Sequence, residues 1–156
     1  MTTTTTTLTT RETDISHFFQ VNIALTGTAY TEVGYFVAVE GLSRRMESFV
    51  YKEGGRAVPH QLMTPAPFGE LVLRWGHMER STLWDWMAAV QVGMGFRRNV
   101  QIIHYMRDQT TAVRTIALTR AWPVEWRGAN LSGEETRVAV EQLSLLYDDL
   151  TMTVTA

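Results

Sequence analysis

The chain has four histidines, the residue type that most often binds zinc or transfers protons at neutral pH. They are His17, His60, His77 and His104. None is placed with another His, Asp or Glu in a known zinc pattern such as His-Glu-x-x-His. The nearest approach is His77 with Glu79, where the carboxylate more readily favours the N-terminus of a following helix. The histidines therefore predict no metal site.

The usual nucleophiles of hydrolytic enzymes are also missing. The chain has no cysteine, which excludes thiol enzymes, thiolate metal sites and a disulfide framework. No Gly-x-Ser-x-Gly sequence occurs, so a serine hydrolase of the α/β type has no nucleophile. Asp148 and Asp149 are adjacent carboxylates, which on a strand point to opposite faces, so we expect a solvated end there. The sequence predicts no catalytic, cofactor-binding or metal-binding residue, no cofactor, and a protein that is not an enzyme.

Glycine spacing and charge argue against phosphate ligands. Gly54–Gly55 and the pair Gly93 and Gly95 match neither Gly-x-x-x-x-Gly-Lys nor Gly-x-Gly-x-x-Gly, so they predict turns. The formal net charge is −2 at pH 7, whereas tight binding of nucleic acid needs clustered Lys and Arg. We therefore expect no specific nucleic-acid partner.

Length and composition are those of one globular domain. The chain has 156 residues, of which 45% are hydrophobic and 19% charged. Residues 2–7 are six consecutive threonines, so residues 1–14 predict a flexible Thr-rich arm and residues 15–156 a single domain. No stretch approaches the roughly 20 apolar residues that span a bilayer, and no signal segment is present. We expect no membrane anchor and synthesis in the cytoplasm.

Apolar and polar residues alternate along most of the chain, which predicts antiparallel strands. Phe19, Val21 and Ile23 begin this pattern, with polar residues between them. It returns at residues 33–39, 46–52, 71–75, 100–104 and 112–126, which gives about seven strands. Pro123 interrupts the last of these and predicts an edge position or a bulge.

One segment follows a helical period instead. The apolar residues at this spacing are Leu83, Trp86, Met87 and Val90. Ser81 or Thr82 can cap the first turn, and Gly93 and Gly95 stop the run. The sequence therefore predicts a single helix of about three turns.

Residues 52–68 hold three of the four prolines and predict a long inter-strand loop without a regular element. Loops of that length in compact domains are usually functional or disordered. Because Leu62, Met63 and Phe68 lie in it, this loop has apolar surface to bury against something.

Periodicity alone leaves the C-terminal part open. Residues 135–150 fit a helix and a strand about equally well, and the Thr-rich tail 151–156 alternates in a way that can add a short strand. The whole pattern predicts a mainly β domain, an antiparallel sandwich or barrel with one helix.

Several motifs, taken in order, resemble those of one family. The most specific are Leu-Trp-Asp-Trp at 83–86 and Ala-Trp-Pro-Val-Glu-Trp at 121–126. Further similar segments are 18–21, 36–42, 51–55, 69–76 and 138–145, although Trp75 separates an Arg and a Gly that the family usually has side by side. The chain from about residue 18 to 150 is thus similar to the tail tube proteins of contractile phage tails and of extracellular contractile injection systems. Because residues 138–145 are similar to the family's final strand, the resemblance implies a strand there and not a helix.

The resemblance implies a small β-barrel or sandwich with a flanking helix, assembling as hexameric rings that stack into a hollow tube inside a contractile sheath. Strands of neighbouring subunits would complete a continuous barrel around the lumen. The implied partners are further copies of the chain, a sheath protein, a baseplate with its tube initiator, a tube cap and protein cargo in the lumen. The implied location is a phage tail or an extracellular injection particle assembled in the bacterial cytoplasm. The loop 52–68 and the Thr-rich arm are free to connect successive rings.

Three polar residues on predicted strands, Gln101, Arg114 and Arg120, are candidates for the lumen wall or a ring contact. The poly-Thr arm and residues 94–99 depart from the commonest tube subunits and leave open a tube initiator, which joins the first ring to the baseplate. A different class also stays open, a small-ligand-binding β-barrel with a mouth lined by tryptophans.

Overall fold

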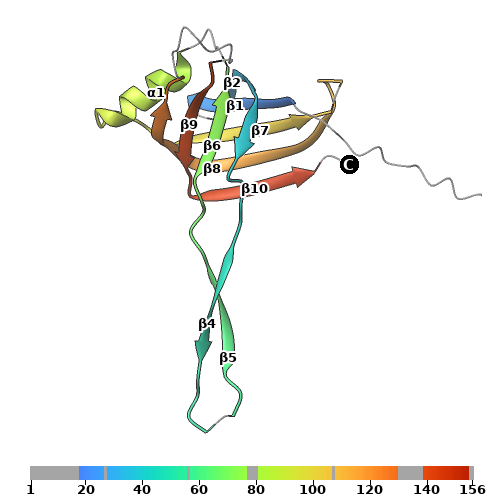
Figure 1. Ribbon diagram of the computed structural model, residues 1–156, viewed down its shortest axis with the longest axis vertical. Coiled ribbons are helices and arrows are strands. Elements are labelled where there is room, and N and C mark those ends of the chain that lie inside the picture. The colour runs from blue at the N-terminus through green and yellow to red at the C-terminus, as the bar shows by residue number, and fades with distance from the viewer. Residues whose placement is uncertain are drawn as a thin grey trace, which may run out of the picture.

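The computed structural model describes residues 18–26, 28–55, 57–76, 81–106, 108–129 and 139–154. Figure 1 shows the elements within them, and their bounds are β1 (Phe18–Thr26), β2 (Ala29–Phe36), β3 (Ala38–Glu40), β4 (Met46–Tyr51), β5 (His60–Pro65), β6 (Leu71–Trp75), α1 (Thr82–Gln91), β7 (Arg98–Tyr105), β8 (Ala112–Arg127), β9 (Glu141–Leu146) and β10 (Asp149–Val154). The predicted Thr-rich arm at residues 1–14, together with His17, His77 and Glu79, lies outside the described residues.

The main sheet curls into a partly open barrel. Its strands follow the hydrogen-bonded order β2-β1-β7-β8-β9-β6-β3, and every pairing is antiparallel. The two ends of this order, β2 and β3, are consecutive in the chain, with only Val37 between them. The Val37 N–H donates to the Arg74 carbonyl of β6 at 2.9 Å, which ties the junction to the far side of the sheet. The mainly β fold with one helix is therefore confirmed, as a barrel.

Strand β8 belongs to both halves of the barrel. Its first half, residues 114–119, pairs with β10, and its second half, residues 122–127, pairs with β9. Between the halves Arg120 has φ +53°, a left-handed conformation that turns the strand. Pro123 lies in the second half, beside a register shift, and β9 is that half's main partner among the described strands. The bulge predicted at Pro123 is confirmed by this register shift. The half-strand that contains it has a full strand partner on one side only, which is β9.

Side chains fill the interior of the barrel. The following are at most 2% exposed: Val21, Ile23, Leu71, Leu73, Trp86, Val100, Ile102, Leu118, Leu143 and Leu145. Helix α1 packs on this core through Leu83 and Trp86, and the Trp86 Nε1–H donates to the Phe96 carbonyl at 3.0 Å. Burial of these groups removes apolar surface from water, at roughly 25 cal/mol per Å². One core therefore holds the barrel and the helix together.

The predicted helix is confirmed, with one difference at its start. Ser81 is the N-cap, but its hydroxyl donates to Asp85 Oδ2 at 2.8 Å instead of accepting from a backbone N–H. At the other end Gly93 takes φ +78°, which a residue with a Cβ adopts only at a cost, and the helix stops.

Strands β4 and β5 form a separate two-stranded arm that projects far from the barrel (Figure 1). The prediction of a loop over 52–68 is wrong for residues 60–65, which pair with β4 in the register Phe49↔Leu62 and Tyr51↔His60. The prolines do not prevent this because Pro59 precedes the strand and Pro65 is its last residue. Residues 52–59 connect the two strands.

The C-terminal part is strand throughout its regular segments. Residues 141–146 form β9, which settles the choice between helix and strand, and residues 149–154 form β10 beside β8. With the arm and β10 included, the chain has more strands than the seven or so that the sequence predicts.

Candidate functional site

Residues that could perform chemistry do not gather in the part of the chain that the structure describes. There, no group of three or more His, Cys, Asp or Glu side chains could hold a metal ion. Of the histidines, His60 lies on β5 and His104 on β7. No helix within the described ranges is long and apolar enough to cross a bilayer. The features that remain are surfaces that other protein chains can contact.

One face of the sheet β2-β1-β7-β8-β10 is polar and uncharged across its middle. The cross-strand rows on this face are Asn22, Gln101, Ala117 and Thr151, and Gln20, Ile103, Thr115 and Thr153. The alternate positions, such as Val21 and Ile102, point into the core. Within the first row, Asn22 Nδ2 donates to Gln101 Oε1 at 3.4 Å. Six of these eight side chains are amides or hydroxyls, so the middle of the face is hydrated. Strand β2 continues the two rows with Glu32 opposite Asn22 and Tyr35 opposite Gln20, so the face carries a charge at that end.

The structure separates the three candidate lumen residues. Gln101 lies in the middle of the polar face. Arg114 pairs with His104 and Val154. On β8 it lies three positions from Ala117, the partner of Gln101, and an odd separation along a strand places the two side chains on opposite faces. Arg120 lies at the bend of β8, where its Nε contacts Asp148 Oδ2 at 3.0 Å. Only Gln101 thus has the placement that a wall residue on this face requires.

Two edges of the sheet have no partner strand among the described residues. Strand β2 pairs with β1 alone, and β10 pairs with β8 alone. Natural proteins usually block such edges with Lys, Pro or a bulge, because an open edge can pair with another chain. Neither residues 29–36 nor residues 149–154 contain Lys, Arg or Pro. Neither edge has a partner strand among the described residues, but β2 has register shifts against β1, one of them at Val33, and carries Glu32, so β10 is the more open of the two.

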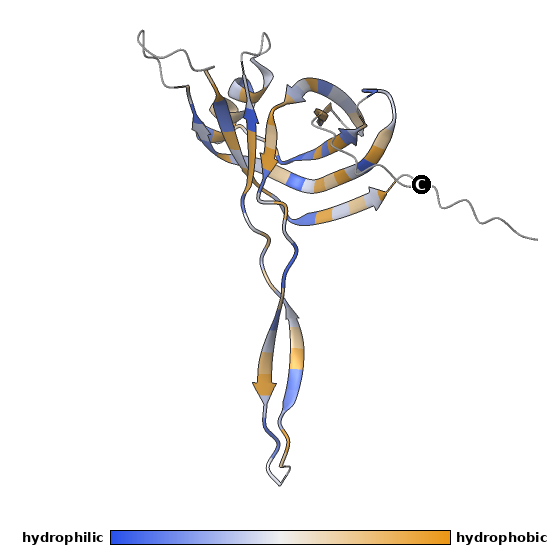
Figure 2. Ribbon diagram, turned by 45° about the vertical axis from the view of Figure 1, so that its right-hand side comes forward, coloured by the Kyte–Doolittle hydropathy of each residue, from blue (hydrophilic) through white to orange (hydrophobic). Residues whose placement is uncertain are grey.

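The arm β4–β5 exposes apolar side chains on both of its faces, because the adjacent Phe49 and Val50 are both more than half exposed. Hydrophobic residues occur on both strands of the arm, as the hydropathy colours in Figure 2 show. The large exposed ones are Met46, Phe49, Val50, Tyr51, Val58, Leu62 and Met63, with Met63 82% exposed. A single hairpin is marginally stable in water. Because exposed apolar surface of this extent marks a contact site, we expect another chain to cover the arm.

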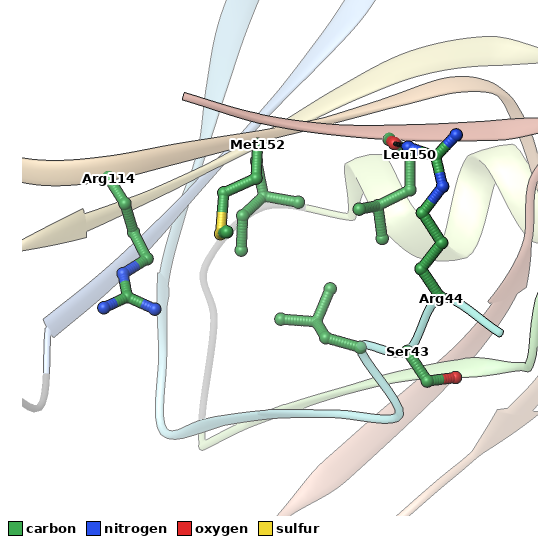
Figure 3. Close-up of a pocket in the computed structure, with 7 residues that line it drawn as sticks. Ser43, Arg44, Arg114, Leu150 and Met152 are labelled. Carbon is green, nitrogen blue, oxygen red and sulfur yellow. Dashed lines mark hydrogen bonds between the residues drawn. The ribbon is translucent and has the colours of Figure 1, made fainter. Parts of the chain in front are cut away.

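A pocket lies where the arm joins the barrel (Figure 3). Its volume is about 460 Å³, and it is lined by Leu42, Ser43, Arg44, Arg114, Ile116, Leu150 and Met152. The lining combines segment 42–44 at the base of the arm with side chains of β8 and β10. Arg44 crosses this junction, since its Nη1 donates to the Leu150 carbonyl at 3.4 Å.

A second apolar patch follows α1. Val92, Met94 and Phe96 are each more than 70% exposed. Next to them in the chain, Arg97 Nη1 donates to Asp148 Oδ1 at 2.9 Å. The sequence singled out residues 94–99 as a departure, and their exposure identifies a surface outside the barrel core.

A family model decides what kind of protein carries these surfaces. The model described as T4-like virus tail tube protein gp19 matches residues 16–151. The chain belongs to this tail tube protein family. The two motifs that best predicted the membership meet in space, because the ring of Trp84 in α1 packs edge-on against that of Trp126 in β8, with centroids 4.7 Å apart. A search of curated proteins finds no match.

Several solved structures share the fold. A chain from the anti-feeding prophage baseplate is 29% identical, with a TM-score of 0.74 and coverage of 90% of this chain and 95% of that one. A chain from the sheath-tube complex of the extracellular contractile injection system PVC is 19% identical, with a TM-score of 0.73 and coverage of 99% and 100%. Hcp1 from Flavobacterium johnsoniae is 14% identical, with a TM-score of 0.55 and coverage of 88% and 96%. The tail tube fold predicted from the motifs is confirmed.

Proposed function

We propose that this tail tube protein is the repeating, non-enzymatic subunit of the inner tube of a contractile injection system or contractile phage tail. Copies form hexameric rings, and the rings stack into a hollow tube that sheath contraction drives into a target. The observation that carries the proposal is the five-stranded sheet with one open edge in β2 and another in β10. A head-to-tail contact between two different edges produces a ring when the rotation closes.

The polar face of this sheet suits the wall of the lumen. Its central residues, Asn22, Gln101 and Thr151, are uncharged and hydrated. A cargo chain that slides past the middle of such a wall meets mostly amide and hydroxyl groups, which give it no large apolar patch to adhere to. We infer that the lumen holds protein cargo and that Gln101 faces it.

The arm supplies the contact between rings. Strand β4, residues 46–51, extends about 20 Å at roughly 3.3 Å per residue, and the arm projects away from the barrel that carries it (Figure 1). Its exposed Phe49, Leu62 and Met63 would be covered by the subunit of the next ring. This assigns ring stacking to a segment that combines a predicted strand, residues 46–52, with part of the predicted loop, residues 52–68.

The similar structures suggest the remaining partners. They come from a baseplate, a tube-terminating cap and a sheath-tube complex, so we propose a sheath, a baseplate and a cap as partners here. The particle would be a phage tail or an extracellular injection device, assembled in the bacterial cytoplasm. A tube initiator is a second candidate, favoured by the 29% identity to a baseplate chain.

A ligand-binding barrel has less support than a tube subunit. The barrel interior is filled by core residues such as Leu71, Leu143 and Trp86, which leave no room for a ligand at its centre. The pocket at the base of the arm lies at an edge of the sheet instead.

Native mass spectrometry of the purified chain at increasing concentration tests the proposal. We expect a species of six times the 17.7 kDa subunit mass and multiples of it. A single-subunit species at every concentration would overturn the proposed ring.

A further inference from the structure

Exposed methionines gather on the surfaces that this protein offers to other chains. Met46 and Met63 lie on the arm, Met94 in the patch after α1 and Met152 on β10, and each is more than half exposed. Of the exposed methionines in the described ranges, only Met106, between β7 and β8, lies outside these surfaces. Because the chain has no cysteine, any oxidation at sulfur falls on a thioether.

Two of these methionines share one face of the arm. Strands β4 and β5 pair in the register Met46↔Pro65 and Ser48↔Met63. Positions 46, 48 and 50 lie on one face of β4, and their partners on β5 lie on the same face. Met46 and Met63 are therefore diagonal neighbours, close enough for long side chains to meet. Together with Val50 they form what we call the methionine face of the arm.

The methionine face is open to an oxidant from solution. Met63 is 82% exposed and Met46 56% exposed, and the arm that carries them projects away from the barrel (Figure 1). Met87 of α1 is the contrast, because its side chain is partly buried and packs against the hydrophobic core. Oxidation of a thioether follows its exposure, so the arm should react well before the core does.

We propose that the methionine face is a redox-sensitive modification site. A peroxide converts Met63 and Met46 of the free subunit to methionine sulfoxide, and the modified arm no longer stacks on the next ring. In this step the sulfur donates a lone pair to one peroxide oxygen, the O–O bond breaks, and the second oxygen of hydrogen peroxide leaves as water with both protons. The sulfur loses the two electrons that the peroxide gains.

The chemical change acts on the contact that the arm makes. A thioether is apolar and flexible, so it adapts to the surface that covers it. A sulfoxide is polar and chiral, and its oxygen is a hydrogen-bond acceptor that is costly to bury without a donor. This part of the inference rests on the proposed function, in which a subunit of the next ring covers the arm.

Oxidation therefore acts before assembly and not after it. In the finished tube the methionine face is covered, so an oxidant no longer reaches the sulfur of Met63. In the free subunit the modification is reversible, because methionine sulfoxide reductases return the sulfoxide to the thioether at the expense of a reductant. Subunits oxidised before assembly stay out of the tube until they are reduced.

Oxidation with hydrogen peroxide, followed by mass spectrometry of the peptides, tests the site itself. In the free subunit we expect Met63 to be oxidised several-fold faster than Met87. In tubes the oxidation of Met63 should slow several-fold compared with the free subunit. Met106 is the internal control, and its rate should be the same in both states, because it lies outside the contact surfaces.

The effect on assembly is measured after the peroxide has been removed. Oxidation of wild type should raise the concentration for half-maximal tube formation about tenfold or more, with little change in the melting temperature of the monomer. Treatment with a methionine sulfoxide reductase should reverse the rise. The double variant Met46→Leu, Met63→Leu keeps the apolar volume without the sulfur and should form tubes before and after peroxide. Met106→Leu is its matched control and should stay as sensitive as wild type.

The outcomes separate this inference from the proposed function. If untreated wild type forms no tubes, stacking itself is wrong and the inference falls with it. If oxidised wild type forms tubes as well as untreated protein does, or if the double leucine variant is as sensitive as wild type, the tube stands and the methionine face is not the redox-sensitive site. Equal oxidation of Met63 in free subunits and in tubes would likewise overturn the inference, because the methionine face would then be uncovered in the tube.

Discussion

Arg120 Nε lies 3.0 Å from Asp148 Oδ2, and this contact joins two bends of the barrel. Arg120 is the point where β8 passes from its β10 half to its β9 half, and Asp148 is the corner between β9 and β10. Asp148 also accepts from Arg97 Nη1, and its N–H donates to the Thr119 carbonyl at 3.0 Å. These bonds hold β10 along the first half of β8, where its outer edge stays open for a neighbour.

The left-handed backbone at Arg120 predicts an unusual order of stabilities. Arg120→Ala and Arg120→Gly both remove the contact with Asp148, but only glycine adopts φ +53° without a steric cost. We expect the glycine variant to be the more stable of the two by about 1 kcal/mol. Urea unfolding followed by tryptophan fluorescence measures the difference. A more stable alanine variant would contradict the backbone conformation at Arg120.

Gly41 is expected to tolerate no side chain. A Cβ at this position would lie 2.1 Å from the Glu70 carbonyl oxygen, and φ is +84°. Gly41→Ala should therefore lower the free energy of unfolding by about 3 kcal/mol or more, through overpacking and backbone strain. Gly54→Ala is the control, because a Cβ there has nothing within 4 Å. Equal stability of the two variants in urea would show that β3 and β6 are not packed as described.

The arm is expected to matter for stacking and not for folding. Phe49 and Leu62 are paired across the arm and are 52% and 44% exposed. The double variant Phe49→Ser, Leu62→Ser should leave the melting temperature of the monomer nearly unchanged, since these side chains contact little of the barrel. It should abolish tubes while single rings persist, which sedimentation velocity can resolve. Val140→Ser, at an exposed apolar position outside the arm and outside the patch after α1, should leave the tubes intact.

Acid should weaken the turn between β7 and β8. Hydrogen bonds from the Thr111 hydroxyl and from the Thr111 and Thr110 N–H groups lower the pKa of Asp108 from 3.8 to about 2. The stabilisation is fully present above the unfolded pKa and is lost as the pH falls through the folded one. The melting temperatures of wild type and Asp108→Ala should therefore differ at pH 5 and converge toward pH 2. Because Asp108 is fully exposed, we expect the difference in melting temperature at pH 5 to be small. A difference that stays constant over this pH range would refute the role of the carboxylate.

The strands and helix of the barrel were predictable because each buries one face. Phe19, Val21 and Ile23 alternate with polar residues, and Leu83 and Trp86 recur at helical spacing, since the other face of each element meets water or a polar surface. Only half of the arm gives such a signal. Residues 46–52 predict the strand that forms β4, whereas prolines at the ends of β5 led to the prediction of a loop there. The family motifs predicted the fold of the chain, but they did not predict the hairpin of β4 and β5.

The placement of the site residues depended on information that a single sequence lacks. Gln101 and Arg114 both look like polar strand residues, and only the register between β7 and β8 separates their faces. The bond between Arg44 and Leu150 joins residues 106 positions apart, which no local pattern links. The open edges likewise become visible only when the order of strands is known.

The most direct test of the account is negative-stain electron microscopy of the purified chain, with the particle mass measured in the same solution. We predict six-fold rings seen end-on and hollow tubes made of stacked rings seen from the side, with masses that are multiples of six subunits. A stable monomer at high concentration, without rings or tubes in any field, would contradict the account.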